Sequence, residues 1–177
     1  MSLSRLLPGA LVVAVVLAGC GQTTQAPSAP QPAPQPPVLP ASLLAEIRSA
    51  GSGSADALDV APLRDPHVED LLQAAMRLEG EGDFAGAAAR IDQALGISAD
   101  DPEILQRRAE YALMLGDWDG AQQHATRSVE LGPKLGPLCR RNWTTLRFAH
   151  EHAGDEIAAV AARERVTACT IEPPVRM

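Results

Sequence analysis

The sequence predicts an all-α protein in which about three helical hairpins stack side by side as a short solenoid. Three observations support this fold class. A pattern of glycine, aspartate, an aromatic residue and alanine recurs after 34 residues. Apolar residues between the copies recur at spacings of three and four, which is the period of an amphipathic helix. An aspartate followed by proline, a typical helix start, occurs at 65–66 and again at 101–102.

Residues 1–19 have the features of a signal peptide. Arg5 precedes an apolar run from Leu6 to Ala18, which is shorter than the roughly 20 residues that span a membrane. The run leads into Leu17-Ala18-Gly19-Cys20, which resembles the lipobox of bacterial lipoproteins. The resemblance implies that the chain is cut before Cys20 and that this cysteine bears a lipid anchor. The alternative is a secretory signal with a chance cysteine.

The residue after Cys20 indicates which membrane is expected to hold the lipid anchor. Gly21 stands there instead of aspartate. In the enterobacterial sorting scheme that this signal resembles, such a residue implies the outer membrane, with the protein facing the periplasm.

Residues 20–64 are expected to be a linker. Residues 21–40 contain seven prolines and no charged residue, so this stretch cannot bury a core. It favours an extended polyproline spacer of about 3.1 Å per residue. The alternative is a disordered tail with no role in setting reach. Within the linker, residues 42–50 are compatible with one short helix, which ends at a Gly-Ser-Gly-Ser joint at 51–54.

The repeated residues each have a physical role in a turn between two helices. The glycine ends the first helix in a left-handed conformation, and the aspartate caps the second. The aromatic residue fills the space between hairpins, and the alanine allows close helix approach. The first copy is Gly82, Asp83, Phe84 and Ala87, the second is Gly116, Asp117, Trp118 and Ala121, and a weaker third has Gly154, Asp155 and Ala159.

These residues and their period resemble the tetratricopeptide repeat. The resemblance implies a helical repeat domain over residues 65–170, followed by a disordered tail at 171–177. Trp143 matches a large apolar core position of the third copy. That copy departs from the family at Arg147, His150 and Glu156, so we expect it to act as a terminal cap.

The two remaining cysteines are placed symmetrically about the third turn. Cys139 lies fifteen residues before Gly154 and Cys169 fifteen residues after it. In an antiparallel hairpin the two side chains come together, so an exported chain is expected to join them in a disulfide. A redox-active pair is the alternative, but the sequence has no Cys-x-x-Cys motif.

The composition narrows the classes of activity and partner. The chain has 177 residues and a net charge of −7, so we expect neither nucleic acid nor anionic headgroups as partners. His150 and His152 lie two residues apart and point to different sides of a helix, so they do not form a metal pair. We expect no catalytic residue, no cofactor and no metal.

In the tetratricopeptide family, the first helices of the hairpins line a concave groove. The positions that match are Glu69, Leu72, Met76, Glu79, Glu103, Gln106, Glu110, Leu113, Met114, Arg141, Thr144 and Phe148. Together they imply an apolar floor with acidic residues around it, suited to a helix or extended peptide with basic flanks. The alternative is that the short helix near residues 42–48 of the same chain fills the groove.

The function expected from these features is that of a membrane-anchored periplasmic scaffold that binds an envelope protein or peptide. Similar architectures serve outer-membrane assembly, pilus assembly and the regulation of cell-wall synthesis. Two alternatives remain open: an enzyme or accessory subunit acting on the cell wall, and a structural spacer without a specific partner.

Overall fold

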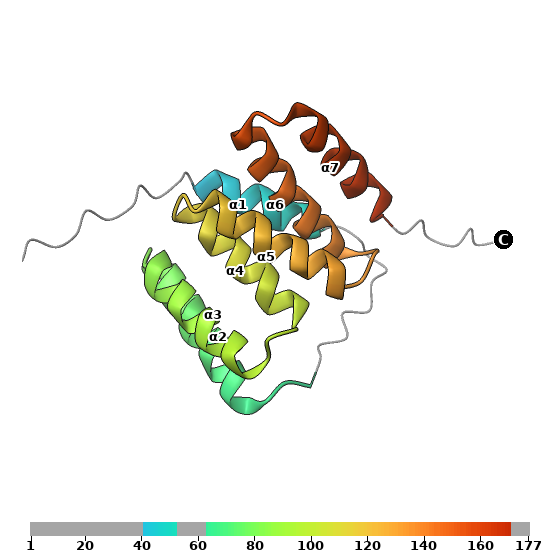
Figure 1. Cartoon of the computed structure of the whole chain (residues 1–177). Helices are drawn as coiled ribbons and strands as arrows, with labels where there is room; N and C mark the ends of the chain where they lie inside the picture. Colours follow the sequence, from blue (N-terminus) through green and yellow to red (C-terminus); the bar gives the residue numbers. More distant parts are fainter. Residues whose placement is uncertain (1–40, 53–62, 171–177) are drawn as a thin grey trace, which may run out of the picture. The chain divides into compact units, whose positions relative to one another are not determined.

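The computed structural model describes residues 41–52 and 63–170. Within these residues the chain forms seven α-helices and no strand, which confirms the all-α prediction. Figure 1 shows their arrangement. The helices are α1 (Ala41–Gly51), α2 (Pro66–Gly80), α3 (Phe84–Ile97), α4 (Pro102–Met114), α5 (Trp118–Leu131), α6 (Pro137–Ala153) and α7 (Glu156–Ala168).

Several predicted features lie outside the described residues. They are the signal peptide at 1–19, the lipid attachment at Cys20, the proline-rich spacer and the tail at 171–177. Among the helices of residues 41–52 and 63–170, none has the length and apolar character required to cross a membrane.

Six of the helices form three consecutive hairpins. Helix α2 packs against α3, α4 against α5 and α6 against α7, and the hairpins meet through α3 with α4 and through α5 with α6. Small side chains lie where the helices approach closely, and several are fully buried. These are Ala75, Ala87, Ala109, Ala121 and Ala159. Between the first two hairpins, the ring of Phe84 lies 6.3 Å from that of Tyr111.

The turns within the three hairpins have the same local geometry. Gly82, Gly116 and Gly154 have positive φ angles of 80°, 74° and 72°, a conformation that a glycine adopts without steric cost. The aspartate after each glycine caps the next helix, because its carboxylate accepts a hydrogen bond from a backbone N–H of the first turn. One sequence pattern therefore produces the same reversal of direction three times.

A disulfide closes the open end of the last hairpin. It joins Cys139, near the start of α6, to Cys169, which follows α7, and their Cα atoms lie 5.7 Å apart. The backbone N–H of Gly136 also donates to the carbonyl oxygen of Cys169 at 2.7 Å. The beginning and the end of the hairpin are thus held together by both a covalent and a hydrogen bond.

Helix α1 packs onto the hairpins and lies in the same compact unit. It contacts α6 and α4, and its apolar residues Leu44 and Ile47 are buried. The Nε of Arg140 donates to the carbonyl oxygen of Ala50 at 2.6 Å, so a guanidinium satisfies the end of α1. The folded part therefore includes a segment that the sequence assigned to the linker, because α1 has an apolar face that requires burial.

Candidate protein-binding pocket

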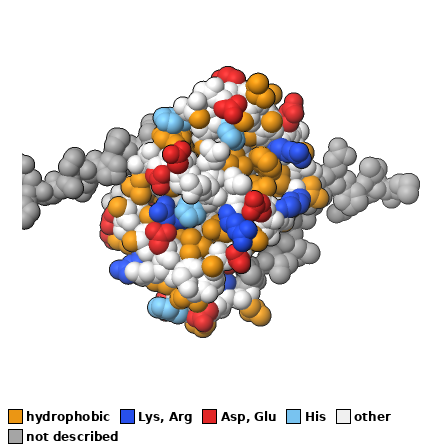
Figure 2. Space-filling model, in the orientation of Figure 1, with side chains coloured by type: hydrophobic (Ala, Val, Ile, Leu, Met, Phe, Trp, Pro, Cys, Tyr) orange, Lys and Arg blue, Asp and Glu red, His pale blue; other side chains and the backbone are white. Residues whose placement is uncertain are grey.

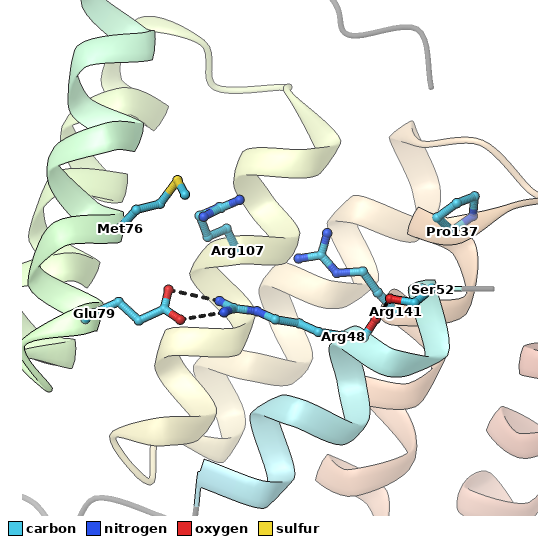
Figure 3. Close-up of a pocket in the computed structure, with 9 residues that line it drawn as sticks. Arg48, Ser52, Met76, Glu79, Arg107, Pro137 and Arg141 are labelled. Carbon is cyan, nitrogen blue, oxygen red and sulfur yellow. Dashed lines mark hydrogen bonds and ion pairs between the residues drawn. The ribbon is translucent and has the colours of Figure 1, made fainter. Parts of the chain in front are cut away.

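A pocket of about 440 Å³ lies beside the predicted groove and includes three of its residues, Met76, Glu79 and Arg141, in its lining. Figure 3 shows its walls, which come from α1, α2, α4 and α6. The lining residues are Arg48, Gly51, Ser52, Met76, Glu79, Gly80, Arg107, Pro137 and Arg141. Three of them are arginines and one is a glutamate, so the pocket has a basic lining in an acidic chain.

Glu110 lies beneath the pocket and is fully buried. The Nε of Arg48 donates to its Oε2 at 3.2 Å, and the Nε of Arg141 donates to Oε1 at 3.0 Å. The side-chain amide of Gln106 donates to the same Oε1 at 3.1 Å and to the Thr145 hydroxyl at 2.8 Å. A buried carboxylate requires such compensation, and here two guanidiniums from two helices provide it.

Glu79 forms the second carboxylate of this network. Figure 3 shows the fork of Arg48 directed at it, and the Nη2–Oε2 distance is 3.0 Å. The Tyr111 hydroxyl also donates to Glu79, at 2.7 Å. Burial acts to raise the pKa of Glu79, but the hydrogen bonds from Arg48 and Tyr111 outweigh it and lower that pKa. Burial and the bond to this carboxylate raise the pKa of Tyr111 to about 12.

Arg107 and Met76 are two pocket side chains that a partner can contact, although Arg107 also interacts with the Tyr111 hydroxyl and with the charge of Glu79. Figure 3 shows them on neighbouring walls, Met76 on α2 and Arg107 on α4. Met76 is 55% exposed, so its thioether side chain is open to solvent at the pocket. Within residues 41–52 and 63–170, Arg107 has no carboxylate within 4.0 Å, whereas Arg48 and Arg141 are both paired.

The structure corrects the predicted groove at its centre. Gln106, Glu110, Leu113 and Met114 are fully buried, so they do not line an open surface. The physical reason is that α6 lies against α4 on this side and α1 covers both. Ile47 of α1 packs in one apolar cluster with Leu113 and Phe148. The alternative prediction was that the short N-terminal helix fills the groove. In the centre of the groove, α1 does so.

The predicted residues at the edges of the groove have varied environments. Leu72 and Thr144 are buried, whereas Met76 is exposed. Glu69 and Glu103, expected as free acidic residues, both pair with Arg64. Because Arg64 and Arg48 neutralise acids of the groove, the acidic rim inferred from the sequence is largely compensated from within the chain.

Two important pocket residues were not among those predicted from the sequence. Arg48 lies on a helix expected in the linker, and Arg107 is not at a groove position of the family. A signal for Arg48 was present, because Glu79 and Glu110 stood on neighbouring first helices without an assigned cation. Burying such carboxylates without partners is unfavourable, so a cation from elsewhere in the chain was required.

The aromatic and histidine residues have structural surroundings. The ring of His152 stacks on Trp118 with centroids 4.0 Å apart. Trp118 and Trp143 pack against separate buried clusters. In the part of the chain that the structure describes, no three His, Cys, Asp or Glu side chains are grouped closely enough to hold a metal ion.

The outer surface adds no second strongly charged feature on the face seen in Figure 2. Basic, acidic and apolar side chains are interspersed there, without a broad patch of one sign. A mixed surface of this kind has no obvious preference for one class of charged partner. On this face, therefore, charge alone does not indicate a binding site.

Comparison with solved structures gives a similarity in both sequence and fold. The chain is similar to the globular C-terminal domain of LpoP from P. aeruginosa, with 30% sequence identity and a TM-score of 0.55. The similarity covers 59% of this chain and 99% of the solved domain. The helical domain belongs to the family of the LpoP C-terminal domain. Neither the protein-family models nor the curated proteins include a match.

The match to nearly the whole length of the LpoP domain indicates that both proteins contain the same helical unit. In this chain the LpoP-type domain combines repeated hairpin turns, a disulfide at the last hairpin and a pocket bordered by α1. Membership in the tetratricopeptide family stays a prediction from the repeat pattern.

Proposed function

We propose that this chain is an envelope lipoprotein whose helical domain binds a protein of cell-wall synthesis, and that it has no catalytic activity of its own. The observation behind the proposal is the similarity to the LpoP domain over 99% of that domain. Similar architectures serve outer-membrane assembly, pilus assembly and the regulation of cell-wall synthesis. The similarity to the LpoP domain favours the last of these roles.

The proposed organisation has three parts. The signal peptide at 1–19 is removed, Cys20 bears lipid, and the following spacer leads to a folded domain that starts with α1 at Ala41. The hairpins are tetratricopeptide-like units with the disulfide-closed third one as the cap. Glycine after Cys20 supports an outer-membrane position facing the periplasm.

The partner is proposed to bind at the pocket bordered by α1, α2, α4 and α6. The central groove is closed by the chain itself, so the open pocket with Met76 and Arg107 is the part available to another protein. An exposed methionine beside charged groups is typical of surfaces that adapt to a partner.

Site-specific photocrosslinking in cells tests this proposal. A photoreactive amino acid at Met76 is expected to give a discrete crosslinked product that contains a protein of cell-wall synthesis. The matched control is the same probe at Ile157 on α7, a helix that contributes no residue to the lining of the pocket, where the side chain is 87% exposed. A smear at both positions, or no product at Met76, contradicts a specific partner at the pocket.

The lipid anchor is tested separately. A clickable fatty acid is expected to label the wild-type chain, and the substitution Cys20→Ser is expected to abolish the label and release the protein from the membrane fraction. Labelling that survives Cys20→Ser would contradict the anchor.

A further inference from the structure

We infer that the pocket recognises a carboxylate of the partner, an aspartate or glutamate side chain with an apolar residue beside it. This inference rests on the proposed function and specifies the chemistry of the contact. It also reverses the charge of the partner that the sequence predicted, because that prediction counted the acidic groove positions without the arginines that pair with them.

The charges around the pocket leave one guanidinium without a carboxylate. Arg48 is bound by Glu79 and Glu110, and Arg141 is bound by Glu110. The Tyr111 hydroxyl donates to Glu79 and also interacts with the side chain of Arg107, and this neutral contact does not balance the charge of Arg107. Among the described pocket residues, Arg107 alone of the three arginines has no carboxylate within 4.0 Å. The local excess of one positive charge favours an incoming anion.

The geometry of the excess charge suits a carboxylate. A guanidinium presents parallel N–H donors that match the two oxygens of a carboxylate. Arg107 is partly buried, so a bond to it is less screened than one at a fully exposed site. The neighbouring Glu79 is ionised, which disfavours a more highly charged group such as phosphate more than it disfavours a single carboxylate.

The rest of the pocket supplies the apolar contact. Met76 and Pro137 present apolar surface on opposite sides of Arg107 in Figure 3. The volume of about 440 Å³ lies within the range of about 300–1,000 Å³ that is typical of small-ligand sites. The pocket therefore holds a few side chains of a partner and not a whole helix.

Binding of short capped peptides isolates the carboxylate contact. The probes are N-acetyl-Leu-Glu-amide and its neutral counterpart N-acetyl-Leu-Gln-amide, titrated into the chain from Gly21 onward, with the arginine Nε–Hε NMR signals as the readout. The glutamate peptide is expected to shift the Arg107 signal at millimolar concentration, and the glutamine peptide to bind at least tenfold more weakly. Equal binding of the two peptides overturns the inference.

A matched pair of substitutions locates the contact. Arg107→Gln is expected to weaken the glutamate peptide at least tenfold, whereas Arg90→Gln on the exposed face of α3 leaves binding unchanged. Arg107→Lys retains part of the affinity, because the charge stays while the two-pronged geometry is lost. Unchanged affinity in Arg107→Gln overturns the assignment of the carboxylate to Arg107.

Crosslinking from position 76 separates this inference from the proposed function. If Arg107→Glu removes the discrete partner product that forms with wild-type Arg107, both the carboxylate inference and the proposed function are supported. If the product persists in Arg107→Glu, the carboxylate inference is wrong and the proposed function remains. Absence of the product in the wild type contradicts the proposed function itself, and a product of two copies of this chain overturns the inference of a different protein as occupant.

Discussion

Replacing Arg48 with methionine tests whether α1 is a structural part of the domain. Methionine keeps an apolar stem of similar length but removes the guanidinium. Glu110 then retains Arg141 and Gln106, and Glu79 retains Tyr111. The substitution therefore weakens the compensation of two carboxylates on two different helices without removing it.

The expected loss follows from the exposure of each partner. Glu110 is fully buried, and the bond to it contributes about 1.5 kcal/mol, the lower end for a hydrogen bond to a charged group. The Arg48 side chain is 36% exposed, so solvent screening reduces its pair with Glu79 to about 1 kcal/mol. We therefore expect the free energy of unfolding to fall by about 2–3 kcal/mol.

Urea unfolding, followed by circular dichroism of the chain from Gly21 onward, measures this change. For a domain of this size, the expected loss lowers the urea midpoint by about 1–2 M. The control is Arg163→Met, whose side chain is 53% exposed and pairs with Glu151, and which we expect to cost under about 0.5 kcal/mol. If Arg48→Met costs no more than this control, the reasoning about α1 is refuted.

The remaining predictions concern the disulfide, the turns and pH. Replacing both Cys139 and Cys169 with serine should lower the free energy of unfolding by about 3–4 kcal/mol, since the bond closes a loop with a sequence separation of 30; a loss under 1 kcal/mol in urea unfolding would contradict this. Gly154→Ala should cost about 1–2 kcal/mol because its φ is 72°, whereas Gly96→Ala, inside α3 with open space around it, should stabilise by about 0.5–1 kcal/mol. Thermal unfolding of the two variants checks that Gly154→Ala lowers the stability and that Gly96→Ala raises it. Because folding lowers the pKa of Glu79, its contribution is fully present above its ordinary value of 4.5 and is lost as pH falls through the folded pKa. The stability difference between wild type and Glu79→Gln should therefore shrink below about pH 4.5, and a constant difference down to pH 2 would be inconsistent with it.

The hairpins were predictable because their determinants are local. A glycine with positive φ and an aspartate cap act within a few residues, so the pattern at 82–83 indicates a turn wherever it recurs. The spacing of Cys139 and Cys169 about Gly154 likewise depends only on the rise of two antiparallel helices. Such features are readable from one sequence without knowledge of how the hairpins stack.

The pocket was not predictable in the same way, because it depends on where α1 docks. The apolar side of α1 was visible in Leu44 and Ile47, but many surfaces can bury two such residues. The position of Arg48 between Glu79 and Glu110 joins residues 31 and 62 positions apart. Family positions indicated Glu110 and Met114 as groove residues, and only the packing of α1 and α6 shows that they are interior.

The placement of α1 also determines the order in which the domain can assemble. Its bonds to α6 connect residues 90 and 101 positions apart, as in Arg140 with Ala50 and Arg147 with Glu46. Contacts of such long sequence separation form late, because the intervening chain must first be ordered. The first helix of the domain is therefore expected to be the last to dock, and until it does the apolar floor that it covers stays exposed.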